Sequence, residues 1–332
     1  MDNEQKSKFK FTFNWILAAI LVILFITISA INSVFLSFGY LAGIMLRNIV
    51  EIGLLALPGT LIVITGGIDL SMGSTLVLSA MVGGMAAVTF GSAGGIIATL
   101  LTGAGCGLFN GFLIAKIKIS PMVTTLATMY LFMGLARSLS KGDSVYTYPA
   151  SQAMGTTYIG GSFPLQIVFY IVLAFIFWFI LSKTILGRSL FGIGLNENAT
   201  YYSGVNTDRV KMITYLLSGL MCAFASIVWL GRFTSIKYDA GTSLGLKVVT
   251  VIVLGGTSIL GGVGDMKSTI LATFIIAVLN SGLTVLNIPI TTQTIVHGMI
   301  LVISLISYSV LNDKAGRAIS APKKLVSRGT AA

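Results

Sequence analysis

Residues 15–35 read WILAAILVILFITISAINSVF, an unbroken apolar stretch without a charged residue. A helix crosses a bilayer in about 20 residues, and this stretch is continuous rather than alternating in hydropathy. It therefore predicts a membrane-spanning α-helix. It is too long for the core of a cleaved signal peptide and no small-x-small cleavage site follows it, so we expect it to be retained as the first span.

Runs of the same kind fill the rest of the chain. Hydrophobic residues make up 55% of its 332 residues and charged residues only 9%, whereas a soluble domain carries about 25% charged residues. Because lipid offers the backbone no hydrogen-bond partner, such runs must form helices. The sequence therefore predicts an all-α membrane protein with about ten transmembrane helices, at residues 15–35, 44–65, 72–90, 94–115, 121–137, 164–181, 212–230, 244–262, 268–287 and 292–310.

The positive charges indicate the orientation of these spans. The net charge is +11. If the N-terminus is cytoplasmic, most of the 21 Lys and Arg residues fall in segments on the cytoplasmic side of the membrane. We therefore expect both termini in the cytoplasm, with a tail at 1–14, a transmembrane domain at 15–311 and a second tail at 312–332. This clustering is a topology signal rather than a binding stripe, so we expect no nucleic-acid partner.

Two pairs of short motifs suggest an internal repeat. GGIDLS at 66–71 resembles GGTSIL at 255–260, and LFNG at 108–111 resembles VLNS at 278–281. A proline follows each of the second pair about ten residues later. With five spans in each half, a repeat would be inverted, which is common in transporters.

The stretch TGGIDLSMGS at 65–74 interrupts an apolar region. Adjacent glycines break a helix, and Asp69 would cost several kcal/mol if it faced lipid. One interpretation is a discontinuous helix pair whose backbone and Asp69 line a polar path. The other is a tight cytoplasmic turn in which Asp69 caps the following helix.

Small and polar residues mark further positions inside the spans. Gly103, Gly107 and Gly111 follow the small-xxx-small spacing that allows two helices to pack closely, and Asn110 beside them can make an interhelical hydrogen bond.

Intramembrane charges occur at few places. Arg47 and Glu51 are four residues apart, so they can pair along one helix, either at a water-accessible cavity or as a structural pair. His297, the only histidine, is expected to be a packing residue rather than a proton relay.

The segment at 186–205, LGRSLFGIGLNENATYYSGV, is predicted to be on the cytoplasmic side. Asn196 suits an N-cap, Glu197 suits the positive helix end, and Gly204 suits the position after the last turn. Together they predict a short helix of about two turns. It can dock a cytoplasmic partner or lie on lipid headgroups.

Motifs for chemistry are missing from the sequence. It contains no Gly-Lys dipeptide of a phosphate loop, no Cys-x-x-Cys and no metal-ligand spacing. We therefore expect no enzyme activity and no cofactor in this chain, so that any ATP is bound by a partner subunit.

Four stretches resemble the permeases of ribose-type ABC importers: residues 66–73, 120–130, 187–204 and 253–262. That family includes permeases for xylose, arabinose, galactose, rhamnose and autoinducer-2. The sequence around residues 56–58 and 130–132 is most similar to the autoinducer-2 and rhamnose members. The resemblance implies a permease dimer (homo- or heterodimer) in the bacterial inner membrane. It also implies an ABC ATPase subunit and a periplasmic or lipid-anchored solute-binding protein as partners.

The resemblance also implies roles for individual residues. The inner segment would be the helix that couples to the ATPase, with Gly187, Arg188, Asn196, Glu197, Ala199, Tyr202 and Gly204. Because sugars are neutral, hydroxyl and amide groups would line the path; the candidates are Asp69, Ser71, Ser74, Asn110, Thr124, Thr125 and Asn280. The competing function is an ion-coupled secondary transporter, which would need Asp69, Glu51 or His297 as a relay.

Overall fold

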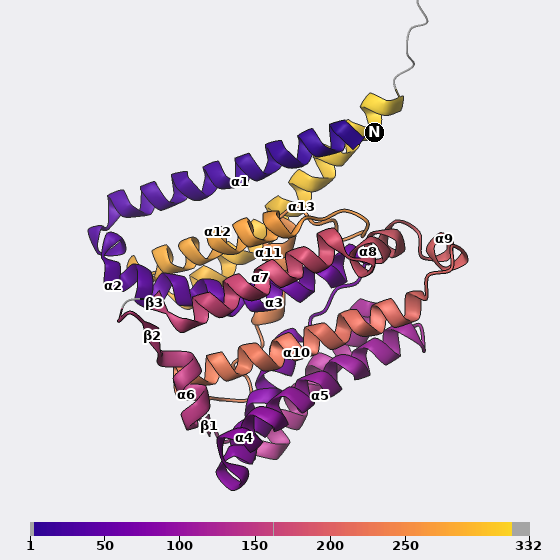
Figure 1. The fold of residues 1–332 in the computed structure, drawn as a ribbon. Helices are drawn as coiled ribbons and strands as arrows, with labels where there is room; N and C mark the ends of the chain where they lie inside the picture. The colour runs from indigo at the N-terminus through magenta and orange to yellow at the C-terminus, as the bar shows by residue number, and fades with distance from the viewer. Residues whose placement is uncertain (1–2, 162, 321–332) are drawn as a thin grey trace, which may run out of the picture.

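The computed structural model describes residues 3–161 and 163–320, and these are mainly helical (Figure 1). The helices are α1 (Asn3–Ile31), η1 (Ser33–Leu36), α2 (Phe38–Tyr40), η2 (Leu41–Met45), α3 (Leu46–Ile64), α4 (Met72–Ala115), α5 (Pro121–Ser140), α6 (Pro149–Thr156), α7 (Leu165–Lys183), α8 (Ile185–Leu195), α9 (Glu197–Tyr202), α10 (Thr207–Phe233), α11 (Leu244–Leu254), α12 (Met266–Val285) and α13 (Ile290–Ser320). Two short antiparallel pairs, β1 (Val145–Tyr146) with β4 (Ser235–Ile236) and β2 (Tyr158–Ile159) with β3 (Phe163–Pro164), complete the described elements.

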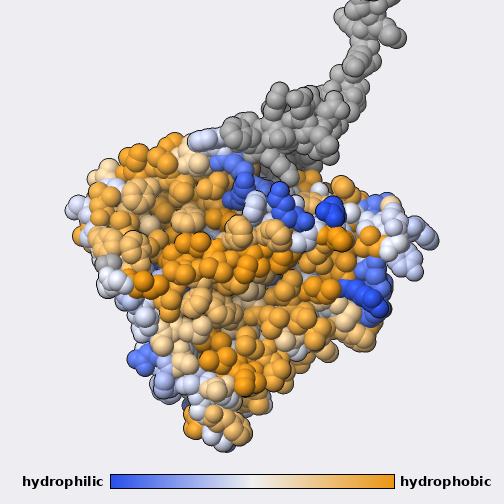
Figure 2. Space-filling model, in the orientation of Figure 1, coloured by the Kyte–Doolittle hydropathy of each residue, from blue (hydrophilic) through white to orange (hydrophobic). Residues whose placement is uncertain are grey.

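Seven helices of the described chain are long and apolar enough to cross a membrane. Figure 2 shows apolar residues covering the middle of one face, and hydrophilic residues gathered toward the end where α8 and α9 lie. The helical membrane fold predicted from the sequence agrees with this structure. The count of ten spans is not settled by it and stays a prediction.

α4 is longer than one membrane crossing. It spans 44 residues, but Gly91 has φ 69° and ψ −174°, which no helix contains. A Cβ on Gly83 would lie 1.8 Å from Thr99 Oγ1, so the two halves lie against each other. The chain therefore folds back at Gly91 into two antiparallel helical segments.

One predicted helix boundary was wrong. The helix predicted over 244–262 ends at Leu254, because Gly256 takes φ 76° and turns the chain. α1 begins at Asn3 and α13 continues to Ser320, and the assignment of residues 1–14 and 312–332 as cytoplasmic tails stays a prediction. Residues 321–332 of the second tail lie outside the described residues.

Glycines allow α4 and α10 to pack closely. A Cβ on Gly103 would lie 2.3 Å from the Gly219 carbonyl oxygen, and one on Gly107 would lie 2.3 Å from the Tyr215 carbonyl oxygen. Gly111 continues the contact along α10. The predicted small-xxx-small face is confirmed, and it joins α4 and α10 along most of the second half of α4.

α3 is the most buried of the candidate spans, with 83% of its apolar window inside the protein. It packs against α7, α11 and α12 on one side and against α10 on the other. Figure 1 shows the resulting two groups: α1, α7, α11, α12 and α13 lie on the α3 side, and α4 and α5 lie beyond α10. α3 thus positions residues that reach both groups.

The first motif pair marks two copies of one turn. Gly66 and Gly256 each have a positive φ just after the end of a helix. In both turns the N–H of this glycine donates to the carbonyl three residues back, and the N–H of the next residue donates to the carbonyl five residues before it. The two turns touch, since the Gly262 N–H donates to the Ile64 carbonyl at 2.8 Å. Equivalent sites of an inverted repeat belong on opposite sides of the membrane, so this pair does not support inversion.

The second motif pair behaves differently. After Asn110 the chain turns at Lys118 (φ 65°), and after Asn280 it turns at Asn287 (φ 57°). The first turn lies beside the start of α10, whereas the end of α12 lies beside α2 at the other end of the molecule (Figure 1). This arrangement is what an inverted repeat requires.

Candidate functional site

α9 is the short helix that the sequence predicts on the inner side. The Asn196 side chain accepts a hydrogen bond from the Ala199 N–H at 3.0 Å, which caps its start. Gly204 ends it with φ 87°, a conformation that glycine adopts without strain. The predicted helix and both caps are confirmed. Tyr202 is 85% exposed, so α9 presents an aromatic side chain outward.

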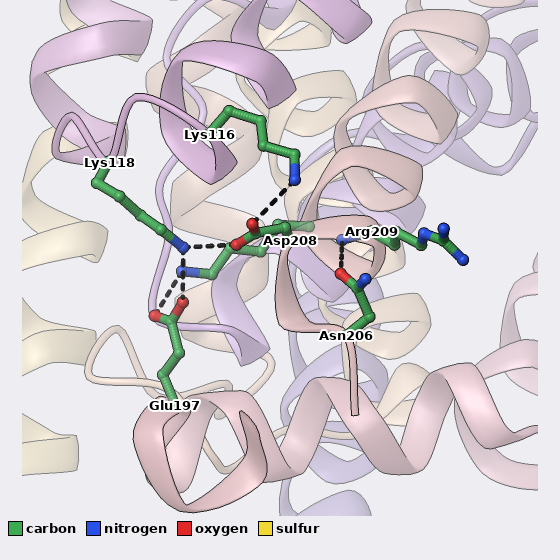
Figure 3. A network of polar contacts seen from close by, with 7 residues as sticks. Lys116, Lys118, Glu197, Asn206, Asp208 and Arg209 are labelled. Carbon is green, nitrogen blue, oxygen red and sulfur yellow. Dashed lines mark hydrogen bonds and ion pairs between the residues drawn. The ribbon is translucent and has the colours of Figure 1, made fainter. Parts of the chain in front are cut away.

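A network of charges fixes α9 to its neighbours (Figure 3). Lys118 Nζ lies 2.5 Å from Asp208 Oδ1 and 3.7 Å from Glu197 Oε1. Lys211 Nζ lies 2.6 Å from Glu197 Oε2, and Lys116 Nζ lies 3.1 Å from Asp208 Oδ2. The hydrogen bond to Asp208 raises the pKa of Lys118 above its ordinary value, so this lysine stays charged at neutral pH.

The network was not predicted, although the sequence holds a signal for it. Two lysines flank a turn between spans, and Asp208 follows Asn206, which caps α10 by accepting a hydrogen bond from the Arg209 N–H at 2.9 Å. Exposed ion pairs contribute at most about 1 kcal/mol each. Their effect is to hold α9 in one orientation relative to the turn between α4 and α5 and to α10.

α8 connects α9 to the two glycine turns. A Cβ on Gly194 would lie 1.9 Å from the Ile64 carbonyl oxygen and 2.3 Å from the Gly262 nitrogen, so only glycine fits there. At the other end of α8, a Cβ on Gly187 would lie 2.1 Å from the Leu181 carbonyl oxygen, while Arg188 is exposed. The seven predicted coupling residues therefore all lie on one continuous segment, α8 to the start of α10.

Asp69 lies in a buried polar cluster and is 5% exposed. Its Oδ1 accepts hydrogen bonds from the Ser71 N–H at 2.9 Å and the Ser71 hydroxyl at 2.6 Å, and its Oδ2 accepts from the Ser218 hydroxyl at 3.2 Å. The Asn110 amide donates to Ser71 Oγ at 2.8 Å. Asp69 therefore holds Ser71, the residue before α4, inside the protein, but it does not cap α4, whose N-cap residue is Ser71.

Two more predicted path residues adjoin this cluster. The Thr125 hydroxyl donates to the Ile68 carbonyl at 2.9 Å, and the Ser74 hydroxyl donates to the Ser71 carbonyl at 2.9 Å. Thr124, the neighbour of Thr125 on α5, is 3% exposed. Elements α4, α5 and α10 thus converge on the connection between α3 and α4.

Asn280 does not belong to this cluster. It lies on α12 next to Ser281, whose carbonyl accepts a hydrogen bond from the Tyr40 hydroxyl at 2.5 Å and whose hydroxyl accepts from Asn48 at 3.0 Å. Asn280 is a path candidate for its amide group, and the sequence echo that pairs it with Asn110 relates opposite ends of the molecule. The structure places it apart from the other six path residues.

Glu51 has a different partner from the one predicted. Its Oε1 lies 2.5 Å from Arg232 Nη1 on α10, and Arg232 Nη2 donates to Asn48 Oδ1 at 3.0 Å. Arg47 instead lies over the Tyr158 ring, 4.9 Å from its centroid. The predicted pair along α3 is therefore replaced by a pair between α3 and α10, because burial of both side chains favours the closer guanidinium.

Comparison with known proteins identifies the family. A family model described as "Branched-chain amino acid transport system / permease component" matches residues 41–305. The chain belongs to this permease family. A related "Autoinducer 2 import system permease protein LsrD" from Photorhabdus temperata is 35% identical over 268 residues, covering 78% of this chain and 80% of the relative. The protein of the same name from Escherichia coli K12 is 34% identical over 304 residues, covering 89% and 91%.

The match agrees with the resemblance drawn from the sequence motifs, since autoinducer-2 permeases are among the importers named there. No solved structure matches this chain. The permease is a multi-pass membrane protein, with its cluster at Asp69 and its exposed helix α9 both inside the matched region.

The cluster at Asp69 predicts a sharp difference between two substitutions in the permease. Asp69→Ala leaves the donors of Ser71 and Ser218 without an acceptor, which we expect to cost about 1–3 kcal/mol per donor left unpaired. Asp69→Asn keeps an acceptor and is expected to lose less. The melting temperatures of the purified variants measure this loss of stability. Equal melting temperatures of Asp69→Ala and Asp69→Asn would contradict the prediction.

Uptake measured on the same two variants tests the path role. If Asp69 takes part in the path, uptake per folded Asp69→Asn molecule falls. Unchanged uptake of Asp69→Ala at normal expression would remove Asp69 from the path residues.

Proposed function

We propose that this permease is the membrane-spanning subunit of a bacterial ABC importer for a small sugar-like solute of the ribose, rhamnose or autoinducer-2 class. ATP would be bound and hydrolysed by a partner subunit, and the chain itself would be neither an enzyme nor a cofactor-binding protein. The relatives, which are autoinducer-2 import permeases, support the solute class. The observation that carries the ATP coupling is α9, a capped helix with an exposed tyrosine. The charge network links this helix to its neighbours through Glu197.

The partners follow from this assignment. The ABC ATPase subunit would bind α9 and the adjoining end of α8. The solute-binding protein would dock at the opposite end, on the segments around β1 to β3 and β4. A second permease, identical or homologous, would complete the path, and lipid would cover the apolar belt.

We also propose that the chain crosses the bacterial inner membrane ten times, in a five-plus-five inverted repeat. Both termini would then lie in the cytoplasm. The fold-back of α4 at Gly91 supports two spans there. The start of α1 and the end of α13 lie toward the end that carries α8 and α9 (Figure 1). The proposed domains are a tail at 1–14, the permease domain at 15–311 and a tail at 312–332.

The deciding experiment reconstitutes the permease with its ATPase and solute-binding protein in vesicles. Radiolabelled ribose, rhamnose and autoinducer-2 are offered with and without ATP. ATP-dependent accumulation of one of them supports the proposal. Accumulation that follows a proton gradient and ignores ATP would instead establish the ion-coupled transporter.

Glu197→Arg is predicted to abolish ATP-dependent uptake. The change replaces the carboxylate that binds Lys211 and Lys118 by a third cation, so α9 loses its fixed orientation. Uptake and ATPase activity of the complex are measured together, and we expect ATP hydrolysis to become independent of solute.

A matched pair of tyrosines separates docking from stability. Tyr202→Ala removes an 85% exposed ring on α9, and Tyr146→Ala removes a 71% exposed ring on β1 at the other end. Neither should change the melting temperature, and only Tyr202→Ala should weaken ATPase binding. Equal binding by both variants would contradict docking at α9.

A further inference from the structure

A cavity of about 180 Å³ lies outward of the Asp69 cluster. Its walls are the first turn of α4, one face of α5 and the turn before α11, with Ser74, Met129, Tyr130, Tyr238 and Thr242 among the lining residues. None of the predicted path residues except Ser74 lines it. No local sequence signal predicts the cavity, because its three walls come from distant segments.

Backbone contact between two helix starts shapes this cavity. A Cβ on Gly73 would lie 2.0 Å from the Gly241 carbonyl oxygen, and one on Gly245 would lie 2.6 Å from the Leu70 carbonyl oxygen. The starts of α4 and α11 therefore meet without side chains between them. Ser74 then links the cavity wall to the buried cluster through its hydrogen bond to the Ser71 carbonyl.

The lining favours a neutral solute with both hydroxyl groups and an apolar face. Ser74 and Thr242 supply hydroxyls, and the rings of Tyr130 and Tyr238 supply flat apolar surfaces with a polar end. Met129 adds an adaptable apolar contact. The residues that line the cavity carry no charge, although two cations lie near the Tyr238 ring, Arg137 at 5.3 Å and Lys237 at 6.0 Å from its centroid.

The cavity is open along α5. Tyr130 is 60% exposed, although it lies in the middle of a helix long and apolar enough to cross a membrane. A tyrosine at that depth needs a polar neighbour for its hydroxyl, since lipid provides none. A water-filled path beside α5 would provide it.

We propose that this cavity is a transient solute site on the transport path, and that Tyr130 and Thr242 contact a small neutral polyhydroxylated solute there. The inference rests on the proposed function and specifies where on the permease the solute passes. The solute then moves beside the Asp69 cluster, where the buried Asn110 side-chain oxygen has no hydrogen-bond partner among the described residues.

Single cysteines test the proposal in the assembled importer. Cys106 and Cys222 are buried and can remain. Tyr130→Cys is compared with Leu131→Cys, the next residue on α5, which is 46% exposed on a different face of the helix. A hydrophilic, membrane-impermeant thiol reagent is expected to label Tyr130→Cys at least about ten times faster, since thiolates form in water and not in lipid.

Solute protection is the second readout. Saturating ribose, rhamnose or autoinducer-2, whichever the wild-type vesicles accumulate, is expected to slow labelling of Tyr130→Cys and Thr242→Cys and to leave Leu131→Cys unchanged. Thr242→Cys keeps the test valid if Tyr130→Cys does not fold. Equal labelling of Tyr130→Cys and Leu131→Cys, or labelling that solute does not slow, would overturn the cavity assignment while wild-type uptake stays intact. Absence of uptake by the wild-type complex would instead count against the proposed function.

Discussion

Gly107→Leu is expected to prevent the permease from accumulating in a folded state. A Cβ at this position would lie 2.3 Å from the Tyr215 carbonyl oxygen and 3.1 Å from the Gly219 Cα, so the clash is with backbone that cannot turn away. Overpacking against side chains costs about 1–3 kcal/mol, and separating α4 from α10 costs more because their whole interface opens.

Gly105→Leu is the matched control. Gly105 is two residues away on the same helix, and a Cβ there would meet no atom within 4 Å. Yield of monodisperse protein and the melting temperature in detergent are measured for both variants. We expect Gly105→Leu to resemble the wild type, and equal losses in the two variants would show that the α4–α10 contact is not tight.

Glu51→Ala is expected to destabilise the permease by about 3–5 kcal/mol, because it leaves the Arg232 guanidinium buried without its carboxylate. The side chains of Arg232 and Glu51 are only 14% and 18% exposed. The double variant Glu51→Gln with Arg232→Met should recover part of the loss, since it removes both charges while keeping similar volumes.

An exposed pair provides the comparison. Lys116→Ala breaks an ion pair whose lysine side chain is 49% exposed, and we expect a change below about 1 kcal/mol. Chemical denaturation of the three variants in one detergent gives the values. If Glu51→Ala costs no more than Lys116→Ala, water reaches the Glu51 carboxylate and the pair is not buried in the assembled protein.

Features with local signals could be predicted from the sequence, and features that depend on distant partners could not. α9 was predicted closely because its signals are local: Asn196 and Gly204 act on backbone groups a few residues away. The partner of Glu51 lies 181 residues along the chain, and the local candidate Arg47 is an equally good partner by spacing alone. Only the packing of α3 against α10 decides between them.

The same reasoning applies to the spans and the path. Hydropathy predicts where apolar runs lie, but it did not show that the run at 244–262 ends at Leu254, because glycine and small apolar residues have nearly the same hydropathy in a helix and in a turn. Six of the seven predicted path residues lie in or beside one cluster, since they flank one break in the chain or face it. Asn280 was included for its amide group, and residue type alone carries no information on distance.

The contact at Gly194 has a mechanical consequence. Three backbones meet there, from α8 and from the turns at Ile64 and Gly262, with no side chain between them. Side chains absorb small displacements by changing rotamer, whereas directly touching backbones transmit them. A force applied to α8 would therefore reach the end of α3 and the loop between α11 and α12 in one step and with little loss. In such a stiff linkage the size of a displacement of α8 sets how far the backbone that it touches must move.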